Sequence, residues 1–519
     1  MLLQTLVEVS AAVAATRSRA AKASLVADAL RSCEPGEVET VVAYLSGELR
    51  QRRTGVGWRA LQQLPDSAAE PSLTVGEVHQ GFELLAAVSG AGSQAARALL
   101  VEQLFSRATA EEQRWLTLLV GGELRQGALD GVMLEAVSRA AGLPAADVRR
   151  AVMLRGAAGP VAEAALTEGA DGLARFRLEV GRPLRPMLAS SAATVAEVFA
   201  RRAHGDAALA VEWKLDGIRV QVHRDGADVA VFTRSLDDIT DRVPEVVDAA
   251  RALPVRSVVL DGEAIALDAA GAPRPFQQTG SRTASRVDVE RLRRTVPLST
   301  YLFDLLHLDG ADLLDRPASD RWAALANTAP TELVVPRLLT ASSAVATAFS
   351  AEAVERGHEG VVVKDPEARY DAGRRGAAWV KVKPRHTLDL VVLAAEWGHG
   401  RRQGWLSNLH LGARDPSSGE LVMLGKTFKG LTDAMLTWQT ARLQELATDP
   451  STGRSSYGVQ VRPELVVEVA FDGVQTSSRY PAGMALRFAR VLRYREDKTA
   501  ADADTLDTVV AIHRRSPIL

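Results

Sequence analysis

The feature that most restricts the possible folds of this chain is a break at residues 181–189, which read Gly-Arg-Pro-Leu-Arg-Pro-Met-Leu-Ala. Pro183 and Pro186 prevent a helix from continuing, because proline lacks a backbone donor and restricts the residue before it. Apolar residues recur at intervals of three and four before the break and form short β-rich runs after it. The chain is long enough for about three domains, and the break predicts that they differ in class.

Residues 1–175 are predicted to form an all-α domain. The segment is rich in Ala and Leu, and Thr109-Ala-Glu-Glu112 has capping-box spacing ahead of an apolar run. Gly142-Leu-Pro144 marks a turn between helices. No internal repeat with a period of roughly 33–45 residues is visible, so a solenoid is not expected.

The rest of the chain is predicted to form two further domains, and the fold class is therefore multi-domain. Residues 183–384 are expected to be mixed α/β, with strands at 210–213, 219–223, 229–233, 258–260, 301–303, 361–363 and 379–382 and helices at 321–327 and 343–356. Residues 388–519 are expected to be all-β, with strands at 388–397, 406–412, 421–428, 464–471 and 486–493 and a helix at 432–446. Such a pattern is compatible with a small barrel of the OB type.

Composition excludes several classes of protein. The single cysteine, Cys33, rules out an internal disulfide and a four-cysteine zinc site and fits a reducing compartment. No apolar run is long enough for a membrane span, and the N-terminus lacks the charge polarity of a secretory signal, so we expect a soluble intracellular protein. The net charge of −2 argues against a histone-like coat. Two segments with five basic and no acidic residues each, 374–386 and 479–495, nevertheless predict local anion sites.

The sharpest local motif is Glu212-Trp-Lys214-Leu-Asp216-Gly217-Ile-Arg219. A strand that ends at a turn permitted by Gly217 would bring a lysine, an acid and an arginine together, although a hairpin with solvated charges has the same pattern. A lysine is a good nucleophile once its amine is neutral, and lowering its pKa from about 10.4 to about 8 requires roughly 3 kcal/mol.

Three cations, Arg219, Lys381 and Lys383, are expected to lower the pKa of Lys214. The neutral amine could attack a carbonyl to form a Schiff base or a phosphorus to form a phosphoramidate. The second reaction needs phosphate-binding cations and a divalent metal, and the first does not.

Further motifs follow Lys214 in a fixed order: Phe232-Thr-Arg234-Ser235, Leu260-Asp261-Gly262-Glu263, Phe303-Asp304, Glu359-Gly360-Val-Val-Val-Lys364, Trp379-Val-Lys381-Val-Lys383 and Arg487 to Lys498. This series resembles the covalent nucleotidyltransferase superfamily of ATP-dependent DNA ligases, RNA ligases and mRNA capping enzymes. Arg185-Pro-Met-Leu-Ala189, Pro275-Phe-Gln277 and Arg493-Tyr-Arg-Glu-Asp-Lys498 resemble the replicative-type, three-domain ATP-dependent DNA ligases in their bacterial version.

That resemblance implies a helical DNA-binding domain, in which Leu124-Arg-Gln-Gly127 is a weaker match, an ATP-grasp-like nucleotidyltransferase (adenylation) domain and an OB-fold domain. It also implies Lys214 as the nucleophile that forms lysyl-AMP. Read without the resemblance, Phe303 would be a core residue, and Glu263 and Glu359 would be surface carboxylates. The other roles that it implies are ATP binding by Glu212, Arg219, Arg234, Glu263, Phe303, Arg375, Lys381 and Lys383, metal binding by Glu263 and Glu359, and orientation of pyrophosphate by Arg495, Asp497 and Lys498.

The implied activity is the sealing of nicks in duplex DNA in replication, repair and recombination, through lysyl-AMP and DNA-adenylate. ATP is the expected substrate, with Mg²⁺, or Mn²⁺ in its place, as the metal. The expected partner is nicked double-stranded DNA bound without sequence preference, by a monomer in the cytoplasm at the nucleoid, away from membranes. The alternatives are an RNA ligase, a capping guanylyltransferase and a non-catalytic nick-binding scaffold. A single cysteine argues against an NAD⁺-dependent ligase with its zinc module.

Overall fold

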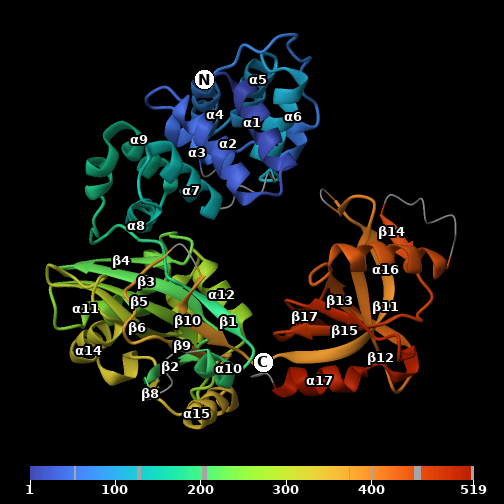
Figure 1. The fold of residues 1–519 in the computed structure, drawn as a ribbon. Coiled ribbons are helices and arrows are strands. Elements are labelled where there is room, and N and C mark those ends of the chain that lie inside the picture. The colour runs from blue at the N-terminus through green and yellow to red at the C-terminus, as the bar shows by residue number, and fades with distance from the viewer. Residues whose placement is uncertain are drawn as a thin grey trace.

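The computed structural model describes residues 1–51, 54–124, 130–201, 207–372, 375–399, 402–448 and 457–515. They form three parts in chain order: a helical part, a mixed α/β part and a β-rich part (Figure 1). The order of the three predicted classes is therefore confirmed. Of the predicted stretch Leu124-Arg-Gln-Gly127, residues 125–127 lie outside the described residues.

The helical part is built around one apolar core that runs from Leu3 to Leu173. Thr109 begins one of its helices with a capping box, as the sequence predicted, since its side chain accepts from the Glu112 N–H and the Glu112 carboxylate accepts from the Thr109 N–H. Thr74 caps a second helix in the same way. The described α-helices are α1 (Leu3–Ala15), α2 (Arg19–Arg31), α3 (Val38–Leu45), α4 (Val75–Ala87), α5 (Ser93–Phe105), α6 (Ala110–Val120), α7 (Asp130–Ala141), α8 (Ala145–Arg155) and α9 (Ala158–Ala174).

The α/β part contains two five-stranded sheets. The first has the order β1 (Leu188–Ala192), β10 (Arg375–Val382), β9 (Gly360–Lys364), β2 (Leu209–Lys214) and β8 (Arg337–Thr340). The second has the order β4 (Asp228–Thr233), β3 (Ile218–Asp225), β5 (Ser257–Ala266), β6 (Leu298–Leu308) and β7 (Ala311–Asp312). Their helices are α10 (Val195–Ala200), α11 (Pro244–Arg251), α12 (Phe276–Ala284), α13 (Val289–Thr295), α14 (Ala318–Thr328) and α15 (Ser343–Glu355).

The β-rich part is an antiparallel sheet in the order β13 (Leu421–Thr427), β12 (Leu406–Arg414), β11 (His386–Trp397), β15 (Val466–Phe471) and β18 (Arg490–Tyr494), with β14 (Gly458–Gln460) also paired to β11. The N–H of Val491 in the last strand donates to the carbonyl of Lys429, just beyond β13, so the two sheet edges meet as in a small barrel. The helix α16 (Asp433–Glu445) lies where the sequence predicted a helix, and the helix α17 (Leu506–Arg515) was not predicted.

The predicted single strand 486–493 is wrong. The structure has two strands there, β17 (Met484–Arg487) and β18, because Phe488 adopts a left-handed backbone conformation with φ of 55°. The kink lets the chain leave β16 (Gly473–Thr476), the partner of β17, and join β15 instead. The β16–β17 hairpin thereby leaves the main sheet, although Val474 and Met484 still pack into the core of the barrel.

The helical part is joined to the α/β part by an apolar cluster. Met153 and Leu154 of α8 pack with Leu184 and Met187 of the connecting segment and with residues of both α/β sheets. Arg150 of α8 also forms a two-pronged ion pair with Asp315, at 2.9 and 2.7 Å. The residues from 181 to 187, between α9 and β1, are called the linker below.

Candidate active site

Lys214 is the last residue of β2, and β3 starts four residues later, so the turn between them lies at one end of both sheets. Gly217 is required in this turn because a Cβ there would lie 2.5 Å from the carbonyl oxygen of Ala264. The N–H of Glu359 donates to the carbonyl of Lys214 at 2.9 Å, which brings a motif 145 positions further along the chain beside the lysine. Two motifs that are distant in sequence therefore meet at Lys214.

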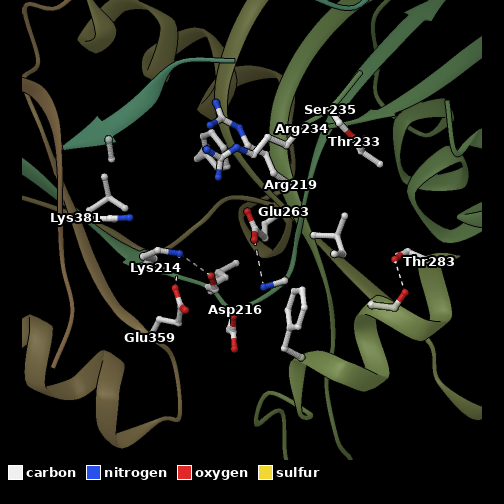
Figure 2. Close-up of a pocket in the computed structure, with 18 of the residues that line it drawn as sticks. Lys214, Asp216, Arg219, Thr233, Arg234, Ser235, Glu263, Thr283, Glu359 and Lys381 are labelled. Carbon is white, nitrogen blue, oxygen red and sulfur yellow. Dashed lines mark hydrogen bonds and ion pairs between the residues drawn. The ribbon is translucent and has the colours of Figure 1, made fainter. Parts of the chain in front are cut away.

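The amine of Lys214 forms an ion pair with Glu359, with 2.5 Å between Nζ and Oε2 (Figure 2). Lys383 donates to the other oxygen of the same carboxylate at 2.6 Å. Burial acts to lower the pKa of Lys214, but the carboxylates of Glu359, Glu263 and Asp216 outweigh burial and raise that pKa above its ordinary value. The expectation that nearby cations lower the pKa of Lys214 is therefore wrong for this structure, because carboxylates lie closer to the amine.

The acidic residues around Lys214 differ in charge state. Burial raises the pKa of the Glu263 carboxyl to about 7, although Lys214 and Arg219 oppose the rise. Burial also acts to raise the pKa of Glu359, but Lys214 and Lys383 outweigh it and hold that pKa at about 2. The pKa values of these two glutamates are thus shifted in opposite directions, and burial raises that of Asp216 as well.

Glu263 and Glu359 form a donor set that suits Mg²⁺. This ion binds through one or two carboxylates plus substrate phosphates and waters, rather than in an all-protein cage. Within the part of the chain that the structure describes, no group of three or more His, Cys, Asp or Glu side chains could hold a metal ion. The carboxyl of Glu263 is buried, and a bound cation would stabilise its ionised form.

Arg219 is held firmly at the start of β3. Its guanidinium donates to both oxygens of Asp261, at 2.9 and 2.5 Å, and to the carbonyl of Met187 at 2.6 Å. The guanidinium carbon also lies 5.4 Å from the ring centroids of Phe303 and Trp379. An arginine fixed in this way presents its charge at a defined position along the cavity.

Glu212, the residue assigned to adenine, lies in a buried charge cluster. Its carboxylate accepts from Arg337 at 2.7 Å and forms an ion pair with Lys364. Glu212 is 2% exposed and still lines the cavity beside Phe303. Sequence reasoning missed Arg337, which lies 125 positions from Glu212 and belongs to no motif. Arg337 and Lys364 together balance the charge of this buried carboxylate.

One cavity of about 1860 Å³ collects most of the predicted site residues. Lys214, Arg219, Arg234, Glu263 and Glu359 surround the same space (Figure 2). The side chain of Arg375 lies outside the described residues, and only its backbone, at the start of β10, is placed. The cavity lining also includes the predicted residues Glu212, Phe303, Lys381 and Lys383.

Three predicted residues lie away from this cavity. Arg495 and Lys498 both pair with the carboxylate of Asp389, at 2.8 and 2.6 Å, and Asp497 pairs with Arg495. The β-rich part instead contributes Asp472, Arg487 and Phe488, from the β16–β17 hairpin and its flanks. The basic groups assigned to pyrophosphate therefore do not face Lys214 in this arrangement.

Three family models of ATP-dependent DNA ligases match successive stretches of the chain. Residues 59–138 match the family described as DNA ligase N terminus, residues 186–383 the ATP dependent DNA ligase domain and residues 402–498 the ATP dependent DNA ligase C terminal region. A solved structure described as "Pmar-Lig_Pre." shares the fold, with a TM-score of 0.61 and 18% identity, covering 95% of this chain and 99% of its own. Within the described residues, no helix has the length and apolarity to cross a membrane.

Two related proteins match this chain along nearly their full length. A "Probable DNA ligase" of Nocardioides sp. (strain ATCC BAA-499 / JS614) is 60% identical over 514 residues, which is 98% of either chain. A "Probable DNA ligase" of Beutenbergia cavernae is 58% identical over 98% of this chain and 99% of the relative. By these matches the chain, with its cavity around Lys214, belongs to the ATP-dependent DNA ligase family, whose members seal nicks in DNA.

Proposed function

We propose that Lys214 is the nucleophile that attacks the α-phosphate of ATP. The observation that carries this proposal is the position of its amine, which lies in the cavity against Glu359 and beside Arg219, Lys381 and Lys383. The raised pKa keeps the resting Lys214 amine protonated, so the ammonium group first releases a proton to solvent. The lone pair of Nζ then forms a bond to the α-phosphorus, the bond from that phosphorus to the bridging β-phosphate oxygen breaks, and pyrophosphate leaves. The product is a lysyl-AMP on Lys214.

The cavity divides into a base side and a phosphate side. On the base side, we propose that Phe303 stacks on adenine and that Glu212, held by Arg337 and Lys364, accepts from its amino group. On the phosphate side, Arg219, Arg234 and Glu263 would contact the ribose and phosphates, and Arg375, Lys381 and Lys383 would bind the α-phosphate. These cations stabilise the charge that develops on the non-bridging oxygens.

Glu359 and Glu263 would hold Mg²⁺ together with the phosphates of ATP. When bound, the ion supplies charge neutralisation on the phosphate oxygens. The protein itself positions the reacting groups. Glu359 holds the Lys214 amine in place, and Asp261 holds the Arg219 guanidinium at a fixed position in the same cavity. Mn²⁺ prefers the same oxygen ligands and is expected to substitute.

We propose two further steps at the same site. The 5′-phosphate of a nick attacks the lysyl-AMP phosphorus and releases Lys214, and the 3′-hydroxyl then attacks the adenylated 5′-phosphate and releases AMP. Arg495, Asp497 and Lys498 would act in the first step only, after the β-rich part has turned to place them at the triphosphate. In the present arrangement they lie away from the cavity, and Arg487 lies there instead.

The partner would be nicked double-stranded DNA, bound through its phosphates and without sequence preference. We propose three domains that contribute to this binding, at residues 1–175, 183–384 and 388–519, although the first strand of the last one already begins at His386. The enzyme is expected to act as a monomer and, because its substrate is chromosomal DNA, at the nucleoid in the cytoplasm.

A label-transfer experiment tests this proposal. The protein is incubated with α-³²P-ATP and Mg²⁺ without DNA and analysed on a denaturing gel beside Lys214→Ala, with labelled GTP and NAD⁺ in parallel. We expect acid-labile label from ATP alone, absent in the variant and discharged by nicked duplex DNA. Label from GTP, or discharge by nicked RNA alone, would instead indicate a capping enzyme or an RNA ligase. No label in folded protein freed of AMP would refute the proposal.

A further inference from the structure

Strand β3 binds the linker through every second residue. Arg219, Gln221 and His223 project from the same face of the strand, as alternate residues of a strand do. Each contacts a different point of the linker, and all three are buried or nearly so, with His223 at 1% and Gln221 at 4% exposure. A strand face next to a domain core normally carries apolar side chains, so three polar residues in a row need a specific reason.

The contacts are hydrogen bonds to the linker backbone. The N–H of Gly181 donates to Nδ1 of His223 at 3.0 Å, and the N–H of Leu184 donates to Oε1 of Gln221 at 2.8 Å. Gln221 returns a hydrogen bond from Nε2 to the carbonyl of Leu184 at 3.2 Å. With the bond from Arg219 to the carbonyl of Met187, the linker is fixed at three successive points.

The two inner residues also hold each other. Nε2 of His223 lies 2.9 Å from Oε1 of Gln221, and because Nδ1 accepts from Gly181, Nε2 carries the proton and donates. This geometry requires a neutral imidazole. Neither side chain reaches the cavity around Lys214, so neither takes part in the chemistry.

The linker is also bound to the helical part. The N–H of Arg185 donates to the carbonyl of Met153 in α8, and Met153 and Leu154 pack against Leu184 and Met187. A displacement of the linker along β3 would therefore shift the whole helical part relative to Lys214. A DNA duplex that is bound by both parts must place its nick at Lys214. When the helical part is held at a fixed position, DNA bound to it is kept near Lys214 at a high effective concentration.

We propose that Gln221 and His223 are positioning residues for nick sealing, which fix the linker on β3 and so hold the helical domain at one distance and orientation from Lys214. The inference rests on the proposed role of Lys214 and on duplex binding by the helical domain. It assigns a function to the Arg185-Pro-Met-Leu-Ala189 motif as well, since Met187 of that motif is the point at which the linker meets Arg219.

The test compares Gln221→Met and His223→Leu with the wild type, and Val222→Ala serves as the matched control. Val222 lies on the same strand but on the opposite face, in an apolar core, so its truncation destabilises the domain without touching the linker. Two assays are run on each protein: lysyl-AMP formation from labelled ATP without DNA, and kcat and KM for sealing nicked duplex.

We expect KM for nicked duplex to rise about tenfold in Gln221→Met and His223→Leu, with lysyl-AMP formation within about twofold of wild type. Val222→Ala should leave that KM unchanged despite a lower Tm. The conservative His223→Asn, whose amide oxygen can still accept from Gly181, should lie near wild type. An unchanged KM in both linker-face variants, or an equal rise in Val222→Ala, would overturn the proposal.

A distance measurement separates this inference from the proposed function. Spin labels at Glu102→Cys on α5 and Glu332→Cys, in a Cys33→Ser background, report the separation of the helical and α/β parts. Gln221→Met should broaden the distance distribution, and Val222→Ala should not. If the wild type formed no lysyl-AMP, the proposed function would fail, and the distance result would still decide whether β3 fixes the helical domain. Identical distributions in all the proteins would contradict such fixation.

Discussion

The carboxylate of Asp216 accepts a hydrogen bond from the guanidinium of Arg487 at 2.8 Å, across 271 positions of sequence. Asp216 lies two residues after the proposed nucleophile, and Arg487 ends strand β17. Lys383 and Asp472 form a second, longer contact between the same two parts, at 3.7 Å. The β16–β17 hairpin is thereby docked over the cavity while Arg495 and Lys498 lie elsewhere.

Replacement of Arg487 should act on the steps that follow lysyl-AMP formation. Arg487→Met removes the ion pair that docks the hairpin, so we expect nick sealing to fall about tenfold, the effect of roughly 1.4 kcal/mol, with lysyl-AMP formation unchanged. Arg479→Met, a change of the same type at an exposed position near the hairpin, is the control. An equal loss in both assays would show that Arg487 serves the first step too.

Replacement of Lys214 should separate the chemical steps. Lys214→Ala lacks the amine and should form no lysyl-AMP, so it cannot seal an ordinary nick. It should still close a nick whose 5′ end is already adenylated, because that step uses the cavity but not the amine. Gel analysis of both substrates decides the point. Loss of activity on the adenylated nick, in a protein with wild-type Tm, would mean that Lys214 acts beyond nucleophilic attack.

Replacement of Arg337 should weaken ATP binding. Arg337→Met leaves Glu212 with Lys364 as its remaining cation partner, so the carboxylate is less firmly held against the base. We expect KM for ATP in lysyl-AMP formation to rise about tenfold, with a smaller change in kcat. Arg356→Met, at the C-terminal cap of α15, provides the comparison. A fall in kcat at unchanged KM would contradict a role in base recognition.

The buried pair of Arg321 and Asp304 should matter for stability alone. Both side chains are fully buried, and two hydrogen bonds at 2.7 and 3.0 Å join them. Arg321→Met would leave an unpaired buried carboxylate, at a cost of about 3–5 kcal/mol in the free energy of unfolding. Chemical denaturation measures this cost. The double variant Asp304→Leu/Arg321→Met should recover much of the loss, and no recovery would show that the remaining partners of Arg321 dominate.

The neutral imidazole of His223 predicts a pH-dependent stability. Burial lowers the pKa of His223 to about 3, and nearby His307 adds to the lowering. Below about pH 6.5 the unfolded chain binds a proton that the native state excludes, so stability falls with pH by up to about 1.4 kcal/mol per unit. The difference in unfolding free energy between wild type and His223→Asn, measured from pH 7 to 5, isolates this contribution. Glu263, whose raised pKa gives the opposite slope, contributes equally to both proteins. A constant difference across this range would refute the prediction.

The order of the motifs was enough to predict the family, the three structural classes and most of the cavity lining. Strand and turn patterns brought Lys214 and Arg219 together correctly, because a short turn joins their strands. The sequence could not predict the sign of the Lys214 pKa shift, since that depends on whether Glu359 or a cation lies nearer to the amine.

Long-range partners were also beyond prediction. Arg337 meets Glu212 only because β8 pairs with β2, and Arg487 meets Asp216 only because one domain docks on another. The kink at Phe488 was hidden by a continuous run of strand-forming residues. In each case tertiary contacts, rather than local propensity, decide the outcome.

The helical part and the β-rich part are attached to the α/β part by different kinds of contact. The helical part is attached mainly through apolar packing around Met153 and Met187, which dissolved ions hardly affect. The β-rich part meets the cavity largely through Arg487, Lys383 and their acidic partners. Added salt therefore weakens the ionic contacts of the β-rich part, whereas at the helical part it weakens the exposed Arg150–Asp315 ion pair and leaves the apolar packing in place. Ionic strength should therefore change the arrangement of the domains as well as the affinity for DNA. Measurements made at different salt concentrations would then report on different conformations of the enzyme.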